Sequence, residues 1–396
     1  MVSRRAVSAD IIIYVVNCRT GKLRFVPVMQ RMDCRYVLTE RIHIMADITK
    51  VDPNFKVSNE VKRDKLAFYD AEEAPFRIYG VKKENGKFRR LPEAVAKSVN
   101  EGVYSLHANT AGGRVRFVTD SEFVAIHAEI ENIPDFPHMP RTGACGLDLY
   151  AAENGVDKYR GSFVPPFYME GGYESIISLG DNKEKLITIN FPLYSDLTKL
   201  YVGISEDAVL KEAPDYTYET PVVYYGSSIT QGGCAARPGN CYQHILTRKL
   251  DCNHINLGFS GSARAEDEMI EWLKNMEMKV FVLDYDHNAP VVEHLRATHE
   301  KLFQAVRESQ PELPIIIMAR PKYDLNEDDT ARLEVIKTTY EHAIAAGDRN
   351  VYFLDGPTLM ADIEDGGTVD NCHPTDSGFA SMARAIYPVL KEILEN

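Results

Sequence analysis

The sequence predicts an N-terminal antiparallel β-sandwich or jelly roll, followed by an α/β domain built on a five-stranded parallel sheet. Two observations predict this order. Between about residues 75 and 205, apolar and polar residues alternate with a period of two, which is typical of half-buried strands. After about residue 216, short apolar runs alternate with longer segments of helical periodicity, which indicates parallel strands joined by helices.

The alternation of the first region is clearest in three stretches, at residues 114–117, 124–130 and 187–191. A short helix is expected near residues 92–99. Turn signals rich in glycine or proline separate the strands, at residues 112–113, 134–140, 171–172 and 180–182. Several short strands separated in this way favour a sandwich or a jelly roll.

The second region contains five short apolar runs, at residues 222–225, 255–259, 280–283, 315–318 and 351–354. Helices are expected between and after them, at about 240–250, 264–276, 291–309, 328–346 and 376–394. Sheets of this kind carry their functional sites at the carboxyl ends of the strands. We therefore divide the chain into an extension of residues 1–44, a sandwich domain of residues 45–215 and an α/β domain of residues 216–396.

The extension differs from the rest of the chain in charge. Residues 1–44 carry eight Lys or Arg and three acidic residues, a net charge of +5, so the total of −13 leaves −18 for residues 45–396. The apolar run at 11–16 is short and has no cleavage site close behind it, which disfavours a signal peptide. Two interpretations stay open: upstream sequence read through before a natural start at Met45, or an ordinary N-terminal tail.

Composition limits the classes of partner. The 44% apolar and 26% charged residues are ordinary for a soluble globular protein. The negative charge argues against nucleic acid or an anionic membrane as a partner, and no apolar stretch is long enough to span a membrane. The seven cysteines are odd in number and form no CxxC pair, so we expect free thiols in a reducing cytoplasm. A homo-oligomer stays open, because a sandwich offers strand edges.

A serine follows the first apolar run of the α/β region, in the sequence Gly226-Ser227-Ser228-Ile229-Thr230. A serine in a tight turn after a parallel strand lies at the carboxyl edge of the sheet. The backbone N–H groups at the start of the following helix can stabilise negative charge near Ser228. The alternative interpretation is a simple turn.

The last loop contains an acid and a histidine, in the sequence Asp370-Asn371-Cys372-His373-Pro374. A serine hydroxyl needs a base to become a nucleophile, and imidazole suits that role. Asp370 can accept a hydrogen bond from His373 and fix its tautomer. The alternatives are a helix-entry turn or a surface pair. Cys372 is interpreted as a packing residue, since it lies too close to His373 in the chain to form a pair with it.

Two further strand ends carry residues that can bind an oxyanion. Gly261 follows the second strand and can offer its backbone N–H, and Asn288 follows the third and can offer its side-chain amide. The alternatives are a turn glycine and a helix cap. Asp286 and His287 are expected to touch substrate or to brace the site. With Asp284 they could suggest a metal centre, but adjacent residues at a strand end do not share a face, so we expect no metal and no cofactor.

These residues, taken together, resemble the SGNH (GDSL-type) hydrolase superfamily. Gly226 to Thr230 match its first block, with Ser227 in place of the usual aspartate. Residues 256–261 match the second block and Asp370 to Pro374 the fifth. The third block, usually Gly-x-Asn-Asp, is not reproduced, and Asn288 is assigned by its position. The sequence Gly146-Leu147-Asp148-Leu149-Tyr150 is similar to the Gly-x-Asp-Leu-Tyr motif of one branch, which has a β-sandwich before the catalytic domain.

The resemblance implies a three-layer, flavodoxin-like catalytic domain over residues 216–396, without a metal. It also implies a serine esterase that acts on small acyl esters, often acetyl groups on carbohydrates. Ser228, Asp370 and His373 would be catalytic, and Ser228, Gly261 and Asn288 would form the oxyanion hole. The partner would be a small-molecule or carbohydrate ester. Two alternatives remain: an acyltransferase with the same Ser228 intermediate, and a carbohydrate-binding protein with a relict site.

Overall fold

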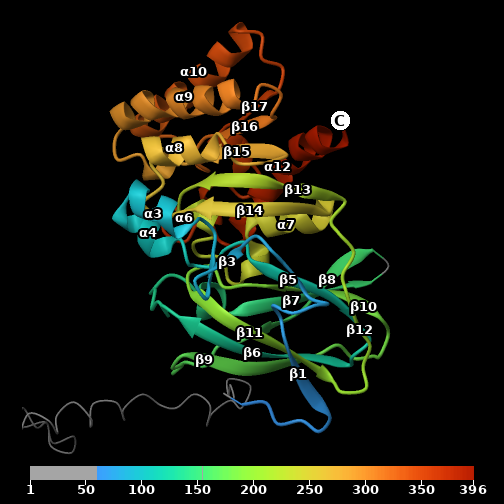
Figure 1. Cartoon of the computed structure of the whole chain (residues 1–396). Helices are drawn as coiled ribbons and strands as arrows, with labels where there is room; N and C mark the ends of the chain where they lie inside the picture. The colour runs from blue at the N-terminus through green and yellow to red at the C-terminus, as the bar shows by residue number, and fades with distance from the viewer. Residues whose placement is uncertain (1–59, 154) are drawn as a thin grey trace, which may run out of the picture. The chain divides into compact units, whose positions relative to one another are not determined.

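The computed structural model describes residues 60–153 and 155–396. The basic extension of residues 1–44 and the start suggested at Met45 lie outside the described residues. Figure 1 shows antiparallel strands in the first part of the described chain and a parallel sheet with helices in the second. The predicted fold class, an all-β domain followed by a five-stranded α/β domain, is confirmed.

The first part forms two antiparallel sheets and a small hairpin. The first sheet has the order β1 (Leu66–Asp70), β11 (Asp196–Ser205), β6 (Phe123–Glu131) and β9 (Gly172–Ser178). The second has the order β12 (Leu210–Lys211), β5 (Arg114–Thr119), β10 (Lys185–Asn190), β7 (Leu147–Glu153) and β8 (Val156–Phe163), and β2 (Arg77–Tyr79) also pairs with β5. Strands β3 (Lys82–Glu84) and β4 (Lys87–Arg89) form the hairpin.

The core of this part explains the alternation in the sequence. On β6, Val124, Ile126, Ala128 and Ile130 are buried, whereas His127 is half-buried and Glu129 is exposed. The buried side belongs to one hydrophobic cluster together with residues of β5, β7, β10 and β11. Because successive side chains of a strand point to opposite faces, this pattern fixes which face of β6 turns inward.

The α/β part contains one parallel sheet, with the order β14 (Cys252–Gly258), β13 (Tyr218–Gly226), β15 (Val280–Asp284), β16 (Ile315–Met318) and β17 (Val351–Leu354). The first strand of the domain lies between the second and the third. In the register of the sheet, Gly226 stands opposite both Gly258 and Asp284. The three strands therefore end together, and the loops that follow them start at one edge.

Helices cover both faces of this sheet and give three layers. Helices α8 (Asp267–Leu273), α9 (Val292–Ser309) and α10 (Glu327–Ala345) share a hydrophobic cluster with Val223 and Tyr225 of β13. Helices α7 (Tyr242–Leu250) and α12 (Asp376–Glu395) share the other cluster with Val222 and Tyr224. A strand that is apolar on both sides is what a parallel sheet between helices requires.

The segment near residue 95 differs from the prediction of a single helix. It forms α3 (Glu93–Val99) and α4 (Glu101–Leu106), because the extended backbone of Asn100 ends the first helix and its side chain accepts from the N–H of Val103 to cap the second. The buried side of this pair joins the cluster beside α8 and α9 rather than the sandwich core. This part of the N-terminal region thus packs as a piece of the α/β layer.

The Gly-x-Asp-Leu-Tyr motif lies on β7, where the sandwich meets the α/β domain. Asp148 is fully buried, and its Oδ2 accepts from Arg237 Nη1 at 2.9 Å and from the backbone N–H of Gly239 at 2.8 Å. Its Oδ1 accepts from Asn190 Nδ2 at 2.8 Å. Charge-assisted hydrogen bonds of this kind are strong, so the motif fixes the sandwich to the loop between α6 (Ser228–Gln231) and α7.

Across the two described ranges, no helix has the length and apolar character needed to cross a membrane.

Candidate active site

Ser228 begins the short helix α6, directly after β13. Ser227 is the N-cap, and its side chain accepts from the N–H of Ile229 at 3.1 Å. Serine and aspartate are both good N-caps, which explains why the departure from the usual aspartate leaves the turn intact. Gly226 permits the close approach of this turn, since a Cβ there would collide with the carbonyl oxygen of Asp284 and the hydroxyl of Thr230.

The three residues predicted to act together form one chain of hydrogen bonds. Ser228 Oγ lies 2.8 Å from His373 Nε2, and His373 Nδ1 lies 2.8 Å from Asp370 Oδ2. An ionised carboxylate can only accept, so Nδ1 carries the imidazole proton. Nε2 is then an acceptor, and the Ser228 hydroxyl donates to it. The geometry therefore gives a serine hydroxyl paired with a base that an acid orients.

The loop of residues 368–374 holds the acid and the base in this arrangement. Asp370 Oδ1 accepts from the backbone N–H of His373 at 2.8 Å and of Cys372 at 3.2 Å. Burial acts to raise the pKa of Asp370, but these bonds and the bond from the His373 imidazole outweigh it and hold the pKa below its ordinary value. The carboxylate is thus ionised at neutral pH and its orientation is fixed from two sides.

Gly261 and Asn288 lie next to each other, at the same edge as Ser228. Gly261 has a φ of +65°, and a Cβ built on it would meet open space. Its backbone N–H donates to Asn288 Oδ1 at 3.0 Å, and Asn288 Nδ2 donates to the carbonyl of Phe259 at 2.8 Å. The backbone N–H of Ser228, at the first position of α6, has no acceptor within that helix.

Asp286 forms a buried ion pair with Arg320. It is 2% exposed, and its carboxylate accepts from Arg320 Nε and Nη2, both at 3.1 Å, and from the backbone N–H of Arg320 at 3.1 Å. Burial would raise the pKa of Asp286, but the charge of Arg320 and its hydrogen bonds lower it. Of the two roles expected for Asp286, the structure favours bracing: it ties the turn after β15 to the segment after β16.

His287 and Cys372 contact each other beside the loop of Asp370. His287 Nδ1 lies 3.7 Å from Cys372 Sγ. Burial, followed by the charge of Arg320, lowers the pKa of His287 to about 4, so this histidine is neutral at neutral pH. Burial and the charge of Asp370 raise the pKa of the Cys372 thiol to about 11, which agrees with a packing role rather than a thiolate nucleophile.

Asp284 anchors α6 from below. Its Oδ2 accepts from the Thr230 hydroxyl at 2.9 Å and the Tyr242 hydroxyl at 3.0 Å. Burial raises the pKa of Asp284 to about 7, although both hydrogen bonds act against that shift. Asp284 is thus hydrogen-bonded to side chains of α6 and α7, whereas Asp286 is paired with Arg320.

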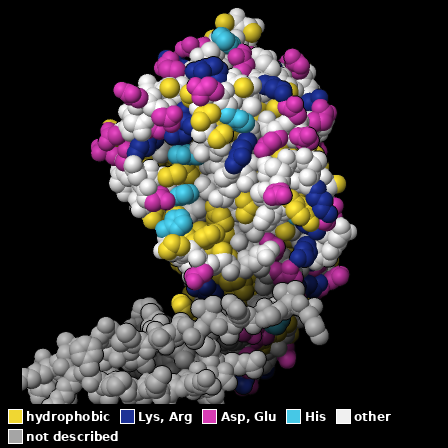
Figure 2. Space-filling model, turned by 90° about the vertical axis from the view of Figure 1, so that its left-hand side faces the viewer, with side chains coloured by type: hydrophobic (Ala, Val, Ile, Leu, Met, Phe, Trp, Pro, Cys, Tyr) yellow, Lys and Arg dark blue, Asp and Glu magenta, His cyan; other side chains and the backbone are white. Residues whose placement is uncertain are grey.

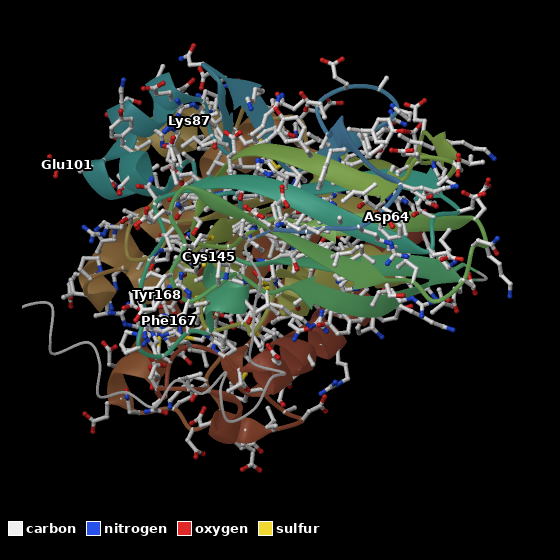
Figure 3. The ribbon with its side chains drawn as sticks, turned by 90° about the horizontal axis from the view of Figure 1, so that it is seen from below. Asp64, Lys87, Glu101, Cys145, Phe167 and Tyr168 are labelled. Atoms are coloured by element: carbon white, nitrogen blue, oxygen red, sulfur yellow. The ribbon has the colours of Figure 1, made fainter. Side chains whose placement is uncertain are left out.

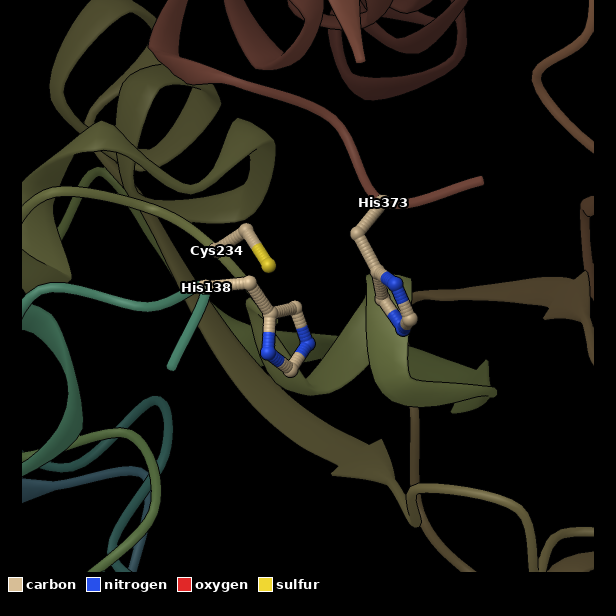
Figure 4. Close-up of side chains that lie close together, drawn as sticks. All are labelled: His138, Cys234 and His373. Atoms are coloured by element: carbon tan, nitrogen blue, oxygen red, sulfur yellow. The ribbon is translucent and has the colours of Figure 1, made fainter. Parts of the chain in front are cut away.

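The sequence did not reveal that the sandwich contributes side chains to this site. The ring of His138, in the loop before α5 (Arg141–Ala144), lies 5.7 Å from the ring of His373 (Figure 4). Phe136 packs edge-on against Tyr194 at 5.3 Å, and the Tyr194 hydroxyl donates to the carbonyl of Ser228 at 3.2 Å. In the sequence these residues belong only to a proline-rich turn and a strand connection, so no pattern signalled them.

Two exposed aromatic side chains lie near this loop. Phe167 is 72% exposed and Tyr168 is 76% exposed, and their rings meet edge to face at 4.9 Å (Figure 3). Arg141, the first residue of α5, contacts this segment: its guanidinium lies 5.9 Å from the Phe167 ring and donates to the carbonyl of Pro166. Figure 2 shows histidines gathered beside a hydrophobic area on one face of the molecule.

A cavity of about 1390 Å³ lies elsewhere, between the segment of residues 78–98 and the outer strand β14 with α8. Trp272 and Ile255 are among the residues that line it, together with several glutamates of α8 and the turn after it. Neither Ser228, Asp370 nor His373 belongs to this lining, so the cavity is not the site described above.

Comparisons with known proteins agree with this architecture. The sequence model of the GDSL-like lipase/acylhydrolase family matches residues 219–391, and the model named GxDLY, for the N-terminus of SGNH-hydrolase-type esterases, matches residues 66–210. A candidate GDSL-like lipase from Bacteroides ovatus is 28% identical, with a TM-score of 0.74 over 83% of this chain and 98% of that chain. None of the curated proteins matches in sequence.

Two more distant structures share the fold. The salicylyl-acyltransferase SsfX3 of a tetracycline biosynthetic pathway is 18% identical, with a TM-score of 0.68 over 84% of this chain and 98% of that chain. An acetyl xylan esterase from Butyrivibrio proteoclasticus is 15% identical, with a TM-score of 0.53 over 83% of this chain and 99% of that chain.

The fold and the family matches define the class of this protein as a carboxylic ester hydrolase. The chain belongs to the SGNH (GDSL-type) hydrolase superfamily, in the branch with a GxDLY-type N-terminal region.

Proposed function

We propose that this protein is a serine esterase in which Ser228 is the nucleophile, His373 the general base and Asp370 the residue that orients it. The observation that carries the proposal is the continuous hydrogen-bond chain, with 2.8 Å between Ser228 Oγ and His373 Nε2 and 2.8 Å between His373 Nδ1 and Asp370 Oδ2. These distances lie within the range needed for proton transfer.

In the proposed reaction, Ser228 Oγ attacks the ester carbonyl while its proton moves to His373 Nε2. The tetrahedral intermediate collapses when His373 returns that proton to the leaving alcohol, which leaves the acyl group on Ser228. Water then attacks the acyl-enzyme with His373 as base, and the acid is released. Asp370 stays ionised throughout and stabilises the imidazolium.

We propose that the oxyanion is held by the backbone N–H groups of Ser228 and Gly261 and by the side chain of Asn288. One N–H of the Asn288 amide is taken by the carbonyl of Phe259, and the second remains to donate. The N–H of Gly261 now donates to Asn288 Oδ1, so it must exchange this partner for the oxyanion when substrate enters.

We propose that the acyl group is small, with acetyl as the first candidate, and that the alcohol is a carbohydrate. Exposed aromatic rings are typical of ligand surfaces, and Phe167 and Tyr168, next to Arg141 of α5, provide such rings. Structural neighbours that are named as carbohydrate esterases, one of them an acetyl xylan esterase, support the same choice.

The first test is hydrolysis of p-nitrophenyl acetate, butyrate and octanoate by the wild-type chain and by Ser228→Ala. We expect turnover of the acetate by wild type and a fall to background in the variant. Equal activity of the two proteins would remove Ser228 from the mechanism. If both are inactive, acetylated sugars are the substrates to assay, since the artificial alcohol then fails to fit.

The proposal that the alcohol is a carbohydrate is tested with the double variant Phe167→Ala/Tyr168→Ala. We expect KM for an acetylated oligosaccharide to rise, while hydrolysis of p-nitrophenyl acetate stays near the wild-type rate. Val156→Ala, at a side chain that is also exposed but lies on β8, is the matched control. An unchanged KM would exclude these rings from the alcohol subsite.

An acyltransferase is the second candidate, and the similarity in fold to the salicylyl-acyltransferase favours it. Both reactions share the acyl-enzyme on Ser228 and differ only in whether water or another alcohol attacks it. Product analysis in the presence of added acceptor alcohols distinguishes them, because a transferase gives a new ester at the expense of free acid.

We also propose a cytoplasmic location, because the five cysteines in the described part of the chain are all free. Fractionation of the native host tests this: recovery of the protein outside the cytoplasm would contradict it.

A further inference from the structure

Two side chains next to the Ser228–His373 pair take no part in the reaction proposed above. They are His138, from the sandwich loop, and Cys234, from the turn that follows α6. One nitrogen of His138, the thiol of Cys234 and one nitrogen of His373 all lie within 4.8 Å of one another. Figure 4 shows the thiol and the His138 ring on the same side of the His373 imidazole.

We propose that His138, Cys234 and His373 bind Zn²⁺, and that occupation of this site switches the esterase off. Two imidazole nitrogens and a thiolate are donors that Zn²⁺ prefers, whereas Mg²⁺ and Ca²⁺ prefer oxygen ligands. The inhibitory part rests on the proposed role of His373, and the binding part does not.

The fold holds two of the ligands firmly in place. Cys234 is 5% exposed and has a φ of +72°, in a turn closed by hydrogen bonds from Gly233 N to the carbonyl of Ser228 at 2.7 Å and from Ala235 N to the carbonyl of Gly232 at 3.1 Å. The backbone that carries the thiol is therefore held in place. His138 is exposed on its loop, so its side chain can move toward Cys234 and His373.

His373 already has the orientation of a metal-bound histidine. Such histidines usually donate their second ring N–H to a carboxylate, and here Nδ1 donates to Asp370 at 2.8 Å. The edge that remains for a metal carries Nε2. The turn of Cys234 faces that edge, since a Cβ built on Gly233 would lie 3.1 Å from His373 Cδ2.

The ligand atoms need only a small adjustment. Tetrahedral Zn²⁺ with two nitrogen ligands and one sulfur ligand holds these atoms about 3.3–3.6 Å apart. The three atoms, now within 4.8 Å of one another, would close by about 1.5 Å or less, and water would complete the fourth position. Burial and the charge of Asp370 raise the pKa of the Cys234 thiol to about 12, so the metal must displace this proton to solvent when it binds.

The expected inhibition follows from the single lone pair of Nε2. When this lone pair is bound to Zn²⁺, it can no longer accept the proton of Ser228, and the nucleophile loses its base. Binding and catalysis are therefore mutually exclusive, whatever the ester.

Direct binding is tested with Co²⁺ as a spectroscopic substitute for Zn²⁺. We expect wild type and Ser228→Ala to show the near-ultraviolet thiolate-to-cobalt absorption, at least as strongly in Ser228→Ala, where the hydroxyl no longer competes for Nε2. Cys234→Ser should abolish this band, Cys372→Ser should retain it, and added Zn²⁺ should displace Co²⁺. Absence of the band in wild type, or its loss in Cys372→Ser alone, would overturn the site.

Inhibition is measured as the Zn²⁺ concentration that halves hydrolysis of p-nitrophenyl acetate, relative to each protein's own rate in EDTA. Loss of a residue that only hydrogen-bonds to a metal ligand weakens metal binding by about 10–100-fold. Loss of a ligand itself should cost at least as much, so His138→Gln and Cys234→Ser should raise this Zn²⁺ concentration at least tenfold. Cys372→Ser is the matched control and should stay at the wild-type value. Equal inhibition of all four proteins, or equal inhibition by Mg²⁺, would contradict the proposal. A wild-type protein without esterase activity would refute the proposed function, and the Co²⁺ measurement would still decide the site.

Discussion

Replacing Asp370 with asparagine tests the proposed mechanism with almost no change of shape. In the structure, Asp370 Oδ1 accepts from two backbone N–H groups, those of His373 and Cys372, and Oδ2 accepts from the His373 imidazole. An asparagine must keep its carbonyl oxygen on the two backbone donors, because its amide nitrogen cannot accept from them. Its NH₂ group then faces His373 Nδ1.

That arrangement forces the wrong tautomer on the base. Two donors cannot pair, so Nδ1 becomes an acceptor and the ring proton moves to Nε2, the atom that has to take the proton of Ser228. The same substitution in a serine protease triad lowers kcat by about 10⁴-fold. We expect a loss of that order here, which corresponds to ~5 kcal/mol of transition-state stabilisation.

The assay is kcat for p-nitrophenyl acetate, with thermal unfolding measured on the same samples. Asp362→Asn is the matched control, since Asp362 is an exposed aspartate that pairs with Arg384 on the surface. We expect Asp370→Asn to unfold near the wild-type temperature while losing activity. A variant that keeps its kcat within tenfold of wild type would refute the assignment of Asp370, as would an equal loss in Asp362→Asn.

Three further predictions concern the oxyanion site, a buried carboxyl and the domain interface. Asn288→Ala should lower kcat by about 10²–10³-fold with little change in KM, and an effect on KM alone would place Asn288 outside the oxyanion hole. In the folded protein the pKa of Asp284 is about 7, whereas its ordinary value, expected in the unfolded chain, is 3.8. Between these pH values the folded state binds the proton more tightly, so the free energy of unfolding should fall as pH rises and level off above pH 7. Asp284→Asn should flatten this dependence in urea unfolding measured from pH 4 to 8, and a parallel curve for the variant would contradict the raised pKa. Asp148→Ala leaves Arg237 without its buried partner and should cost about 3–5 kcal/mol of unfolding free energy, whereas a cost below 1 kcal/mol would show that the interface does not depend on this contact.

The local elements of the fold could be read from the sequence with good accuracy. The five strands of the parallel sheet and helices α7, α9, α10 and α12 lie within a few residues of the predicted ranges. Helix α8 is shorter than predicted, because Ala265 has a φ of +55° and the helix begins only at Asp267. Helical and strand periodicities are local properties of the chain, so these elements can be predicted without knowledge of the tertiary structure.

The meeting of Ser228 and His373 could also be predicted, since both follow strands of one parallel sheet and such strands end at a common edge. The 2.8 Å contact between them agrees with that reasoning. Asp370 could be predicted as the partner of His373 because the two residues share a turn.

The surroundings of these residues depend on tertiary packing and could not be predicted from the sequence. The partners of Asp286 and Gly261 come from other loops: Arg320 binds the carboxylate of Asp286, and Asn288 accepts from the N–H of Gly261. His138 lies beside the His373 ring although it belongs to a sandwich loop, and the sandwich also contacts the loop between α6 and α7 through Asp148. Side-chain contacts between distant segments follow from how packed surfaces fit together, and no periodicity or spacing in one sequence records that fit.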